Sequence, residues 1–124
     1  MTRLFLFQFD MTTIYHNPRC SKSRNTLSLL NEQGVNPDIV LYLDNPPTVA
    51  TLKSLVDKLG VSIFDIVRKG ESVYAELGLK QREVDENEMM QIISENPKLL
   101  ERPIVVNGDK AAVGRPPENV LNIL

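Results

Sequence analysis

The sequence predicts an α/β fold, because its apolar pattern changes period along the chain. Residues 12–15 and 38–43 are short apolar runs typical of strands, and a helix-forming stretch around Asn25 separates them. A strand, a helix and a second strand make a βαβ unit, whose two strands we expect to be parallel. Near the C-terminus the strand pattern returns around residues 107–108, which carry a strong hairpin signal, Asn-Gly.

The first helix and the second strand have clear boundaries. Gly34 is a suitable C-terminal stop for the helix. Residues 38–43 are continuously apolar, which is typical of a buried strand rather than an amphipathic one. Thr48 is predicted to cap the next helix. In that helix apolar residues recur with helical spacing, namely Leu52, Leu55, Val56 and Leu59.

Two further capping signals predict helices in the middle of the chain. Each is a polar residue followed by a carboxylate three positions later. The first, Ser62 with Asp65, opens a short helix, and the second, Asp85 with Glu88, opens a helix that Pro97 ends.

The last third of the chain predicts a hairpin and a closing helix. Residues 104–106 and 111–113 are apolar and flank the Asn-Gly pair at 107–108. Pro116 and Pro117 suit the first turn of a helix. The whole order is β-α-β, helices, then β-β-α, which is the arrangement of thioredoxin.

Bulk composition describes an ordinary globular chain. Its 124 residues suffice for one domain, and 42% of them are hydrophobic and 24% charged. The net charge of −2 gives no reason to expect nucleic acid or an anionic membrane as a partner. A single cysteine cannot form an internal disulfide. We therefore expect a cytoplasmic monomer.

The N-terminus faintly resembles a signal peptide, because an apolar run over residues 4–9 follows Arg3. The run is short, Gln8 and Asp10 interrupt it, and no small-residue cleavage site follows. We interpret residues 1–11 as a tail or a miscalled start, and residues 12–124 as a single domain. No stretch of the sequence approaches the length of a membrane span.

Cys20, the single cysteine, lies where a predicted strand is followed by a helix. The free N–H groups and the dipole at a helix N-terminus favour negative charge, and they can also hold an oxyanion. Arg19, Lys22 and Arg24 act in the same direction. These features favour a reactive thiolate. The alternative is a small buried hydrophobic residue, as many free cysteines are.

Two polar neighbours bear on the thiol. Ser23 stands where a dithiol redox site has its second cysteine, so a dithiol mechanism within this chain is excluded. Ser23 can donate a hydrogen bond to the thiolate, or it can cap the helix. His16, the only histidine, can stabilise the thiolate or serve as a structural hydrogen-bonding group. One histidine and one cysteine predict no metal site.

Three arginines are candidates for binding an anion, although composition alone describes Arg68, Arg102 and Arg115 as surface charges. Arg102 and Pro103 precede a predicted strand, where a cis-proline would direct the backbone toward a thiol site. Arg115 ends the predicted hairpin. The planar guanidinium group suits bidentate contact with a tetrahedral oxyanion.

Residues 15–27, Tyr-His-Asn-Pro-Arg-Cys-Ser-Lys-Ser-Arg-Asn-Thr-Leu, resemble the active-site segment of the glutaredoxin-coupled arsenate reductases. The likeness extends over residues 12–124 and is greatest to the short chromosomal members of that family. Further matching motifs are residues 41–47, Arg68-Lys69, residues 101–106 and Gly114-Arg115-Pro116.

The resemblance implies a thioredoxin-like fold with three layers, α/β/α, and a helical insertion. It implies Cys20 as the nucleophile, with His16 and Ser23 assisting it, and Pro103 as a cis-proline. It also implies that arsenate is bound by the arginine trio Arg68, Arg102 and Arg115.

The implied reaction reduces arsenate to arsenite through a thioarsenate ester on Cys20. Glutathione is the implied co-substrate, a glutaredoxin is the implied partner, and no bound cofactor is expected. Two alternatives stay open. One is a non-enzymatic regulator of the Spx type that binds RNA polymerase, although such proteins usually carry two cysteines where this chain has Cys20 and Ser23. The other is a general glutathione-dependent thiol oxidoreductase.

Overall fold

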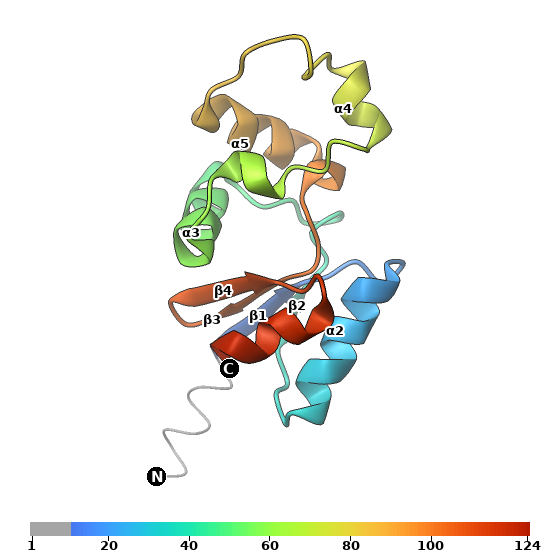
Figure 1. Ribbon diagram of the computed structural model, residues 1–124, viewed down its shortest axis with the longest axis vertical. Coiled ribbons are helices and arrows are strands. Elements are labelled where there is room, and N and C mark those ends of the chain that lie inside the picture. The colour runs from blue at the N-terminus through green and yellow to red at the C-terminus, as the bar shows by residue number, and fades with distance from the viewer. Residues whose placement is uncertain (1–10) are drawn as a thin grey trace. The chain divides into compact units, whose positions relative to one another are not determined.

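A computed structural model describes residues 11–124, so the interpretation of residues 1–11 lies outside the described residues, apart from Met11. The chain divides into two compact units (Figure 1). Unit 1 comprises the part up to Tyr42 together with Arg102–Leu124, and unit 2 comprises Leu43–Glu101. That residues 12–124 form one domain stays a prediction.

Unit 1 contains a mixed sheet, which within residues 11–124 has four strands in the order β2-β1-β3-β4. Strands β1 and β2 are parallel, whereas β1 with β3 and β3 with β4 are antiparallel. The predicted parallel pair and the predicted hairpin are therefore confirmed. The elements of the unit are β1 (Thr12–Tyr15), α2 (Ser21–Glu32), β2 (Asp38–Val40), β3 (Ile104–Asn107), β4 (Lys110–Val113) and the 3-10 helix η3 (Pro117–Ile123).

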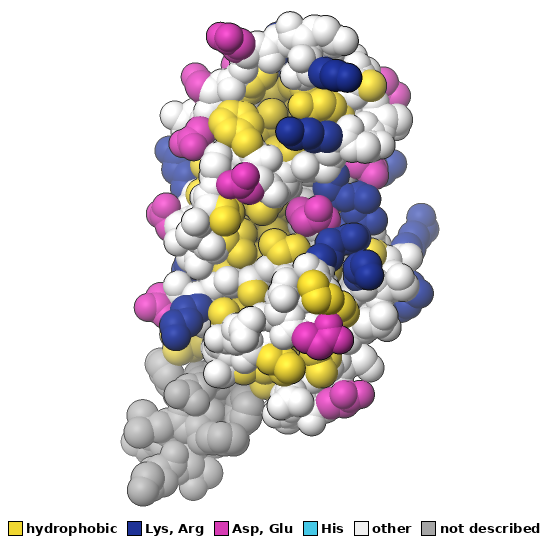
Figure 2. Space-filling model, in the orientation of Figure 1, with side chains coloured by type: hydrophobic (Ala, Val, Ile, Leu, Met, Phe, Trp, Pro, Cys, Tyr) yellow, Lys and Arg dark blue, Asp and Glu magenta, His cyan; other side chains and the backbone are white. Residues whose placement is uncertain are grey.

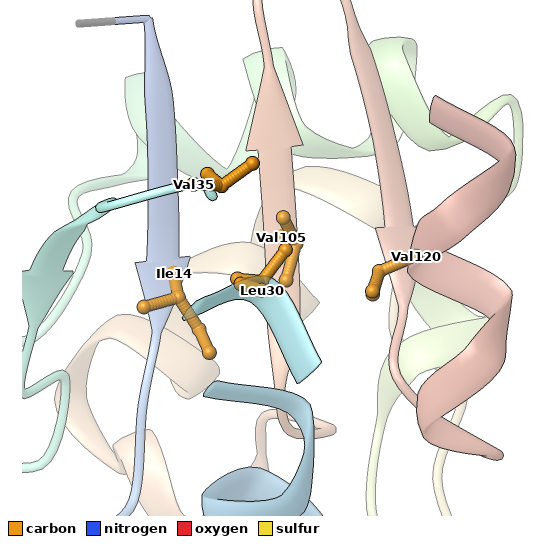
Figure 3. Packing of buried hydrophobic residues seen from close by; sticks show 5 residues of the cluster. All are labelled: Ile14, Leu30, Val35, Val105 and Val120. Carbon is orange, nitrogen blue, oxygen red and sulfur yellow. The ribbon is translucent and has the colours of Figure 1, made fainter. Parts of the chain in front are cut away.

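The core of unit 1 lies between the sheet and the two helical segments α2 and η3, which contact one another. Ile14 of β1 and Val105 of β3 are direct register partners, and both are fully buried. Leu30 of α2 and Val120 of η3 pack against them (Figure 3). Unit 1 by itself thus has two layers, and the third predicted layer stays a prediction.

The prediction of a buried second strand is wrong. Strand β2 spans only Asp38–Val40, and Ile39 remains 50% exposed. Within residues 11–124 the strand lies at the edge of the sheet and pairs with β1 alone, and all three of its residues are at least partly exposed. An apolar run is typical of burial on both faces, but it carries no information on the place of the strand in the sheet.

The hairpin turn lies one residue later than the Asn-Gly signal indicates. Asn107 pairs with Lys110 in the ladder, so the two-residue loop is Gly108 and Asp109. Gly108 has φ 64, and a glycine with positive φ at the first central position suits a type II′ turn. The Asn107 side chain instead donates through Nδ2 to the carbonyl of Ile123 at 2.7 Å, which ties the hairpin to the end of η3.

Unit 2 is helical. Its elements are α3 (Val49–Leu59), the 3-10 helix η1 (Ile63–Ile66), α4 (Ser72–Glu76), α5 (Glu86–Glu95) and the 3-10 helix η2 (Pro97–Leu99). The predicted caps are confirmed: the Thr48 hydroxyl accepts from the Thr51 N–H at 3.1 Å, and the Asp85 carboxylate accepts from the Glu88 N–H at 2.8 Å. Ser62 begins η1 with the predicted capping box.

Helices α3 and α5 pack against each other inside unit 2. Leu52, Leu55 and Val56 of the predicted pattern on α3 are buried, whereas Leu59 is half-buried. On α5 the buried residues are Met89, Met90 and Ile93. On the visible face of the molecule, charged side chains of both signs are interspersed with hydrophobic ones (Figure 2). Among residues 11–124, no helix combines the length and the apolar character that a membrane span requires.

Candidate active site

Cys20 occupies the N-cap position of α2, and its side chain is partly exposed. Its backbone N–H donates to the carbonyl of Asn17 at 3.0 Å, and its own carbonyl accepts from the Arg24 N–H at 3.0 Å. The side chain itself makes no capping hydrogen bond. The helix therefore begins with a thiol at the place where negative charge is favoured. The alternative of a buried hydrophobic cysteine is wrong.

The loop before α2 is held by its own polar groups. The Asn17 side-chain oxygen accepts from the Arg19 N–H at 3.0 Å. Arg24 donates through Nη1 to the Pro18 carbonyl at 2.9 Å, so this cation also fixes the loop. These contacts hold the backbone on both sides of Pro18 and so determine where Cys20 enters the helix.

The guanidinium group of Arg115 lies against the thiol. Its Nη2 atom is 3.7 Å from the Sγ atom of Cys20, which is a hydrogen-bond distance to sulfur. Its Nε atom donates to the Arg102 carbonyl at 2.8 Å and so fixes the plane of the group. The structure thus brings together Arg115 and Cys20, which the sequence places far apart.

Arg102 and Pro103 lie next to the segment of unit 1 that carries Arg115. The Nε and Nη1 atoms of Arg102 are shielded from solvent. The Arg102–Pro103 peptide bond is cis, and so is the Arg115–Pro116 bond, which the sequence did not suggest. The Pro103 carbonyl accepts from the Gly114 N–H at 2.9 Å, so the segments that carry the two arginines run next to each other.

Arg68 belongs to unit 2 and has carboxylate partners there. Its Nη1 atom is 2.8 Å from the Glu71 carboxylate, and its Nε atom is 3.8 Å from that of Glu101. Its backbone N–H donates to the Leu99 carbonyl at 2.7 Å. Neither ion pair was predicted from the sequence. Arg68 lies in unit 2, whereas Arg102 and Arg115 lie in unit 1, and the assembly of the three stays a prediction.

His16 and Ser23 contact each other. The His16 Nδ1 atom is 2.6 Å from the Ser23 Oγ atom, and both side chains are buried. Burial lowers the pKa of His16 below its ordinary value of 6.5, and the positive charge of Arg24 lowers it further. His16 is therefore neutral near pH 7, so the idea that its charge stabilises the thiolate is not supported.

The role predicted for Ser23 depends on where its single hydroxyl proton goes. The Ser23 oxygen already accepts from the Asn17 N–H at 3.0 Å. If the hydroxyl donates to Nδ1 of His16, no proton remains for the thiolate. Only the His16 tautomer with a proton on Nδ1 leaves the Ser23 hydroxyl able to donate to Cys20. Ser23 is not the N-cap residue, because Cys20 takes that place.

The sequence predicted no role for Thr26 and Gly114, which contact each other between α2 and the segment of Arg115. Thr26 is fully buried on α2, and its hydroxyl is 3.5 Å from the Gly114 carbonyl. One signal was available, since Ser23, Thr26 and Leu30 lie on one face of the helix and all are buried. A polar side chain on the buried face of a helix needs a hydrogen-bond partner, and for Thr26 the Gly114 carbonyl is one.

The arrangement provides a partly exposed thiol beside a fixed cation at a helix N-terminus. Such a group can attack an anionic electrophile and stabilise the charge on it. Within residues 11–124, no group of three or more His, Cys, Asp or Glu side chains is placed to hold a metal ion.

Comparison with known sequences identifies one protein family. The model of the ArsC family matches residues 15–123. A protein of Escherichia coli K12 called "Uncharacterized protein YfgD" is 53% identical over 112 residues, which cover 90% of this chain and 94% of that protein. A protein of Haemophilus influenzae named "Arsenate reductase" is 48% identical over 112 residues, covering 90% and 97% of the two chains.

Solved structures agree with this result. A structure called "Arsenate reductase from Vibrio cholerae" has a TM-score of 0.89 and 45% identity, over 93% of this chain and 99% of that one. A structure from Yersinia pestis has a TM-score of 0.86 and 50% identity, over 90% and 98%. The predicted thioredoxin-like α/β fold is confirmed. The family model covers nearly the whole chain, and two relatives share about half of their residues with it. The chain therefore belongs to the ArsC family.

Proposed function

We propose that this protein is an arsenate reductase in which Cys20 is the nucleophile. The observation that carries the proposal is the 3.7 Å contact between Nη2 of Arg115 and Sγ of Cys20 at the start of α2. A thiolate and a bound oxyanion both require positive charge, and one guanidinium group at this place serves both. The relatives named "Arsenate reductase" support arsenate as the oxyanion.

In the first proposed step the Cys20 thiolate attacks arsenic(V). A sulfur–arsenic bond forms, and an arsenate oxygen leaves as hydroxide or, after protonation, as water. The oxidation state of arsenic does not change in this step. Arg115, the N–H groups at the start of α2 and, by the family resemblance, Arg102 and Arg68 stabilise the negative charge.

In the second step the electrons pass from two thiols to arsenic. A glutathione thiolate attacks the sulfur of Cys20, so that a disulfide bond forms and the sulfur–arsenic bond breaks. The electron pair of that bond stays on arsenic, which leaves as arsenite. A glutaredoxin thiol then takes the glutathione group and releases the Cys20 thiolate. Because Cys20 is the single cysteine of the chain, the second thiol must come from outside.

A coupled assay tests the proposal. The protein is mixed with arsenate, glutathione, a glutaredoxin, glutathione reductase and NADPH, and NADPH oxidation is followed. We expect oxidation that depends on arsenate and disappears in Cys20→Ser. The matched control is Ser28→Ala, which changes an exposed serine on the same helix. Absence of any Cys20-dependent oxidation would overturn the proposal.

A second candidate is glutathione-dependent reduction of mixed disulfides. The observation that favours it is a partly exposed single thiol with Ser23 at the place of a second cysteine. The two functions differ in what they need from the arginines, because a mixed disulfide has no tetrahedral oxyanion. Activity on a glutathione mixed disulfide that Arg102→Ala leaves intact, together with no activity on arsenate, would favour this candidate.

A further inference from the structure

We propose that Gly114 and Thr26 are positioning residues that set the distance between the Arg115 guanidinium group and the Cys20 sulfur. The inference rests on the proposed function, in which Arg115 serves the nucleophile. Gly114 follows β4 directly and precedes Arg115, and Thr26 lies on α2, the helix that Cys20 begins. Their contact therefore joins the two elements that carry the reacting pair.

The hydroxyl of Thr26 is held in place. It is fully buried and donates to the Lys22 carbonyl of its own helix at 2.8 Å. The Gly114 carbonyl lies 3.5 Å from the same hydroxyl and is its second, more distant acceptor. A β-branched side chain on a helix has few χ1 choices, so Thr26 cannot rotate away from β4 at low cost.

Gly114 has no room for a side chain. A Cβ atom there would lie 2.5 Å from Oγ1 of Thr26, 3.0 Å from its Cγ2 and 2.8 Å from Cγ of Pro103. Carbon and oxygen atoms do not approach so closely without a shift of the chain. Gly114 is also absent from the glycines with positive φ among the described residues, so a close approach, and not a special backbone conformation, explains the glycine.

The shift would reach the active site through the next residue. Arg115 is bonded covalently to Gly114, and its Nε atom is held by the Arg102 carbonyl at 2.8 Å. Gly114 itself donates to the Pro103 carbonyl at 2.9 Å. If the segments Gly114–Arg115 and Arg102–Pro103 move away from α2, the Arg115 guanidinium group moves away from Cys20. The spacing at Gly114 and Thr26 thus fixes the 3.7 Å contact.

Alkylation of Cys20 measures this contact without arsenate turnover. Full-length Gly114→Ala is treated with iodoacetamide at pH 7, with and without arsenate, and modified protein is quantified by mass spectrometry. We expect alkylation at least about threefold slower and arsenate protection about threefold to tenfold weaker. The full loss of a hydrogen bond to a charged group corresponds to about tenfold or more, which we expect for Arg115→Ala.

Two further variants separate positioning from general damage. In an Arg115→Ala background, Gly114→Ala should cause no additional slowing, because the group it displaces is gone. Adding Thr26→Ala to Gly114→Ala removes two of the three crowded atoms and should restore alkylation toward the rate of Thr26→Ala alone. The matched control is Gly70→Ala, since Gly70 has open space around it and no positive φ.

Three results would overturn the inference: Gly114→Ala alkylated at the normal rate, full slowing in the Arg115→Ala background, or no recovery in the double variant with Thr26→Ala. If Gly114→Ala does not fold, as judged by circular dichroism, the folded double variant decides. Absence of arsenate turnover would overturn the proposed function but leave the alkylation comparison valid, so the two failures are distinguishable.

Discussion

The Nη2 atom of Arg115 lies 3.7 Å from the Sγ atom of Cys20, although 95 positions separate the two residues in the sequence. The contact joins the end of the β3–β4 hairpin to the N-cap residue of α2. Because Nε of Arg115 is fixed by the Arg102 carbonyl, the guanidinium group has a defined orientation toward the sulfur. A preorganised cation beside a nucleophile stabilises negative charge without reorganising during the reaction.

Arg115 should be necessary for arsenate turnover. We expect Arg115→Ala to lower kcat/KM for arsenate by about tenfold or more, because a hydrogen bond to a charged group is lost. Arg115→Lys keeps the positive charge but has no Nε atom to donate to the Arg102 carbonyl. Its kcat/KM for arsenate should therefore lie between the values of the wild-type protein and of Arg115→Ala. The coupled NADPH assay measures both. A fully active Arg115→Ala enzyme would contradict the proposed role.

Ser23 should contribute to stability as well as to the site. Its hydroxyl is buried and bonded to His16 at 2.6 Å and to the Asn17 N–H at 3.0 Å. Ser23→Ala leaves these partners without their hydroxyl, which costs about 1–3 kcal/mol in the free energy of unfolding. Urea denaturation measures the loss, and the exposed Ser28→Ala is its control. Equal stability of the two variants would show that His16 and Asn17 find other partners.

Protonation of His16 should destabilise the fold in mild acid. The pKa of His16 is lowered in the folded protein, whereas in the unfolded chain it is near 6.5. Below pH 6.5 the unfolded state therefore binds more protons than the folded state, so the free energy of unfolding falls as the pH decreases.

The measurement is urea denaturation at pH 7.5, 6.5 and 5.5, pH values chosen around the ordinary pKa of histidine. The chain has no other histidine. His16→Gln should therefore lose most of the decrease over this interval, even if its stability at pH 7.5 is lower. An equal pH dependence in both proteins would assign the decrease to carboxylates.

Arg68 should affect arsenate binding more than folding. Its ion pairs with Glu71 and Glu101 are partly exposed, and such pairs contribute about 0–1 kcal/mol to stability. If Arg68 binds the oxyanion as proposed, Arg68→Ala raises KM for arsenate by about tenfold. Arg82→Ala is the matched control, because Arg82 also has a carboxylate partner in unit 2, Glu88. An unchanged KM would limit Arg68 to a structural role.

Helix caps and helix starts were predicted well, because the interactions that form them lie within a few residues of each other. The caps at Thr48 and Asp85 each depend on an N–H three positions away, so the sequence contains the whole interaction. Cys20 was placed correctly at a helix start for the same reason. The exposure of Ile39 could not be predicted, because burial of a strand's face depends on which segments pack over it, and these segments are distant in sequence.

The candidate site was predicted as a set of residues but not as a set of contacts. His16 and Ser23 were considered as separate partners of the thiol, whereas the structure bonds them to each other. Thr26 and Gly114 were missed, since the closeness of α2 to the end of β4 has no local signal. The pairing of Arg115 with Cys20 likewise depends on the hairpin returning to the helix.

The hydrogen bond from Asn107 to the Ile123 carbonyl ties local opening of η3 to the hairpin. For η3 to detach, the Asn107 side chain must release its acceptor, so backbone amides of η3 should exchange their hydrogens with solvent slowly. Replacing Asn107 by alanine would free η3 to open without the hairpin.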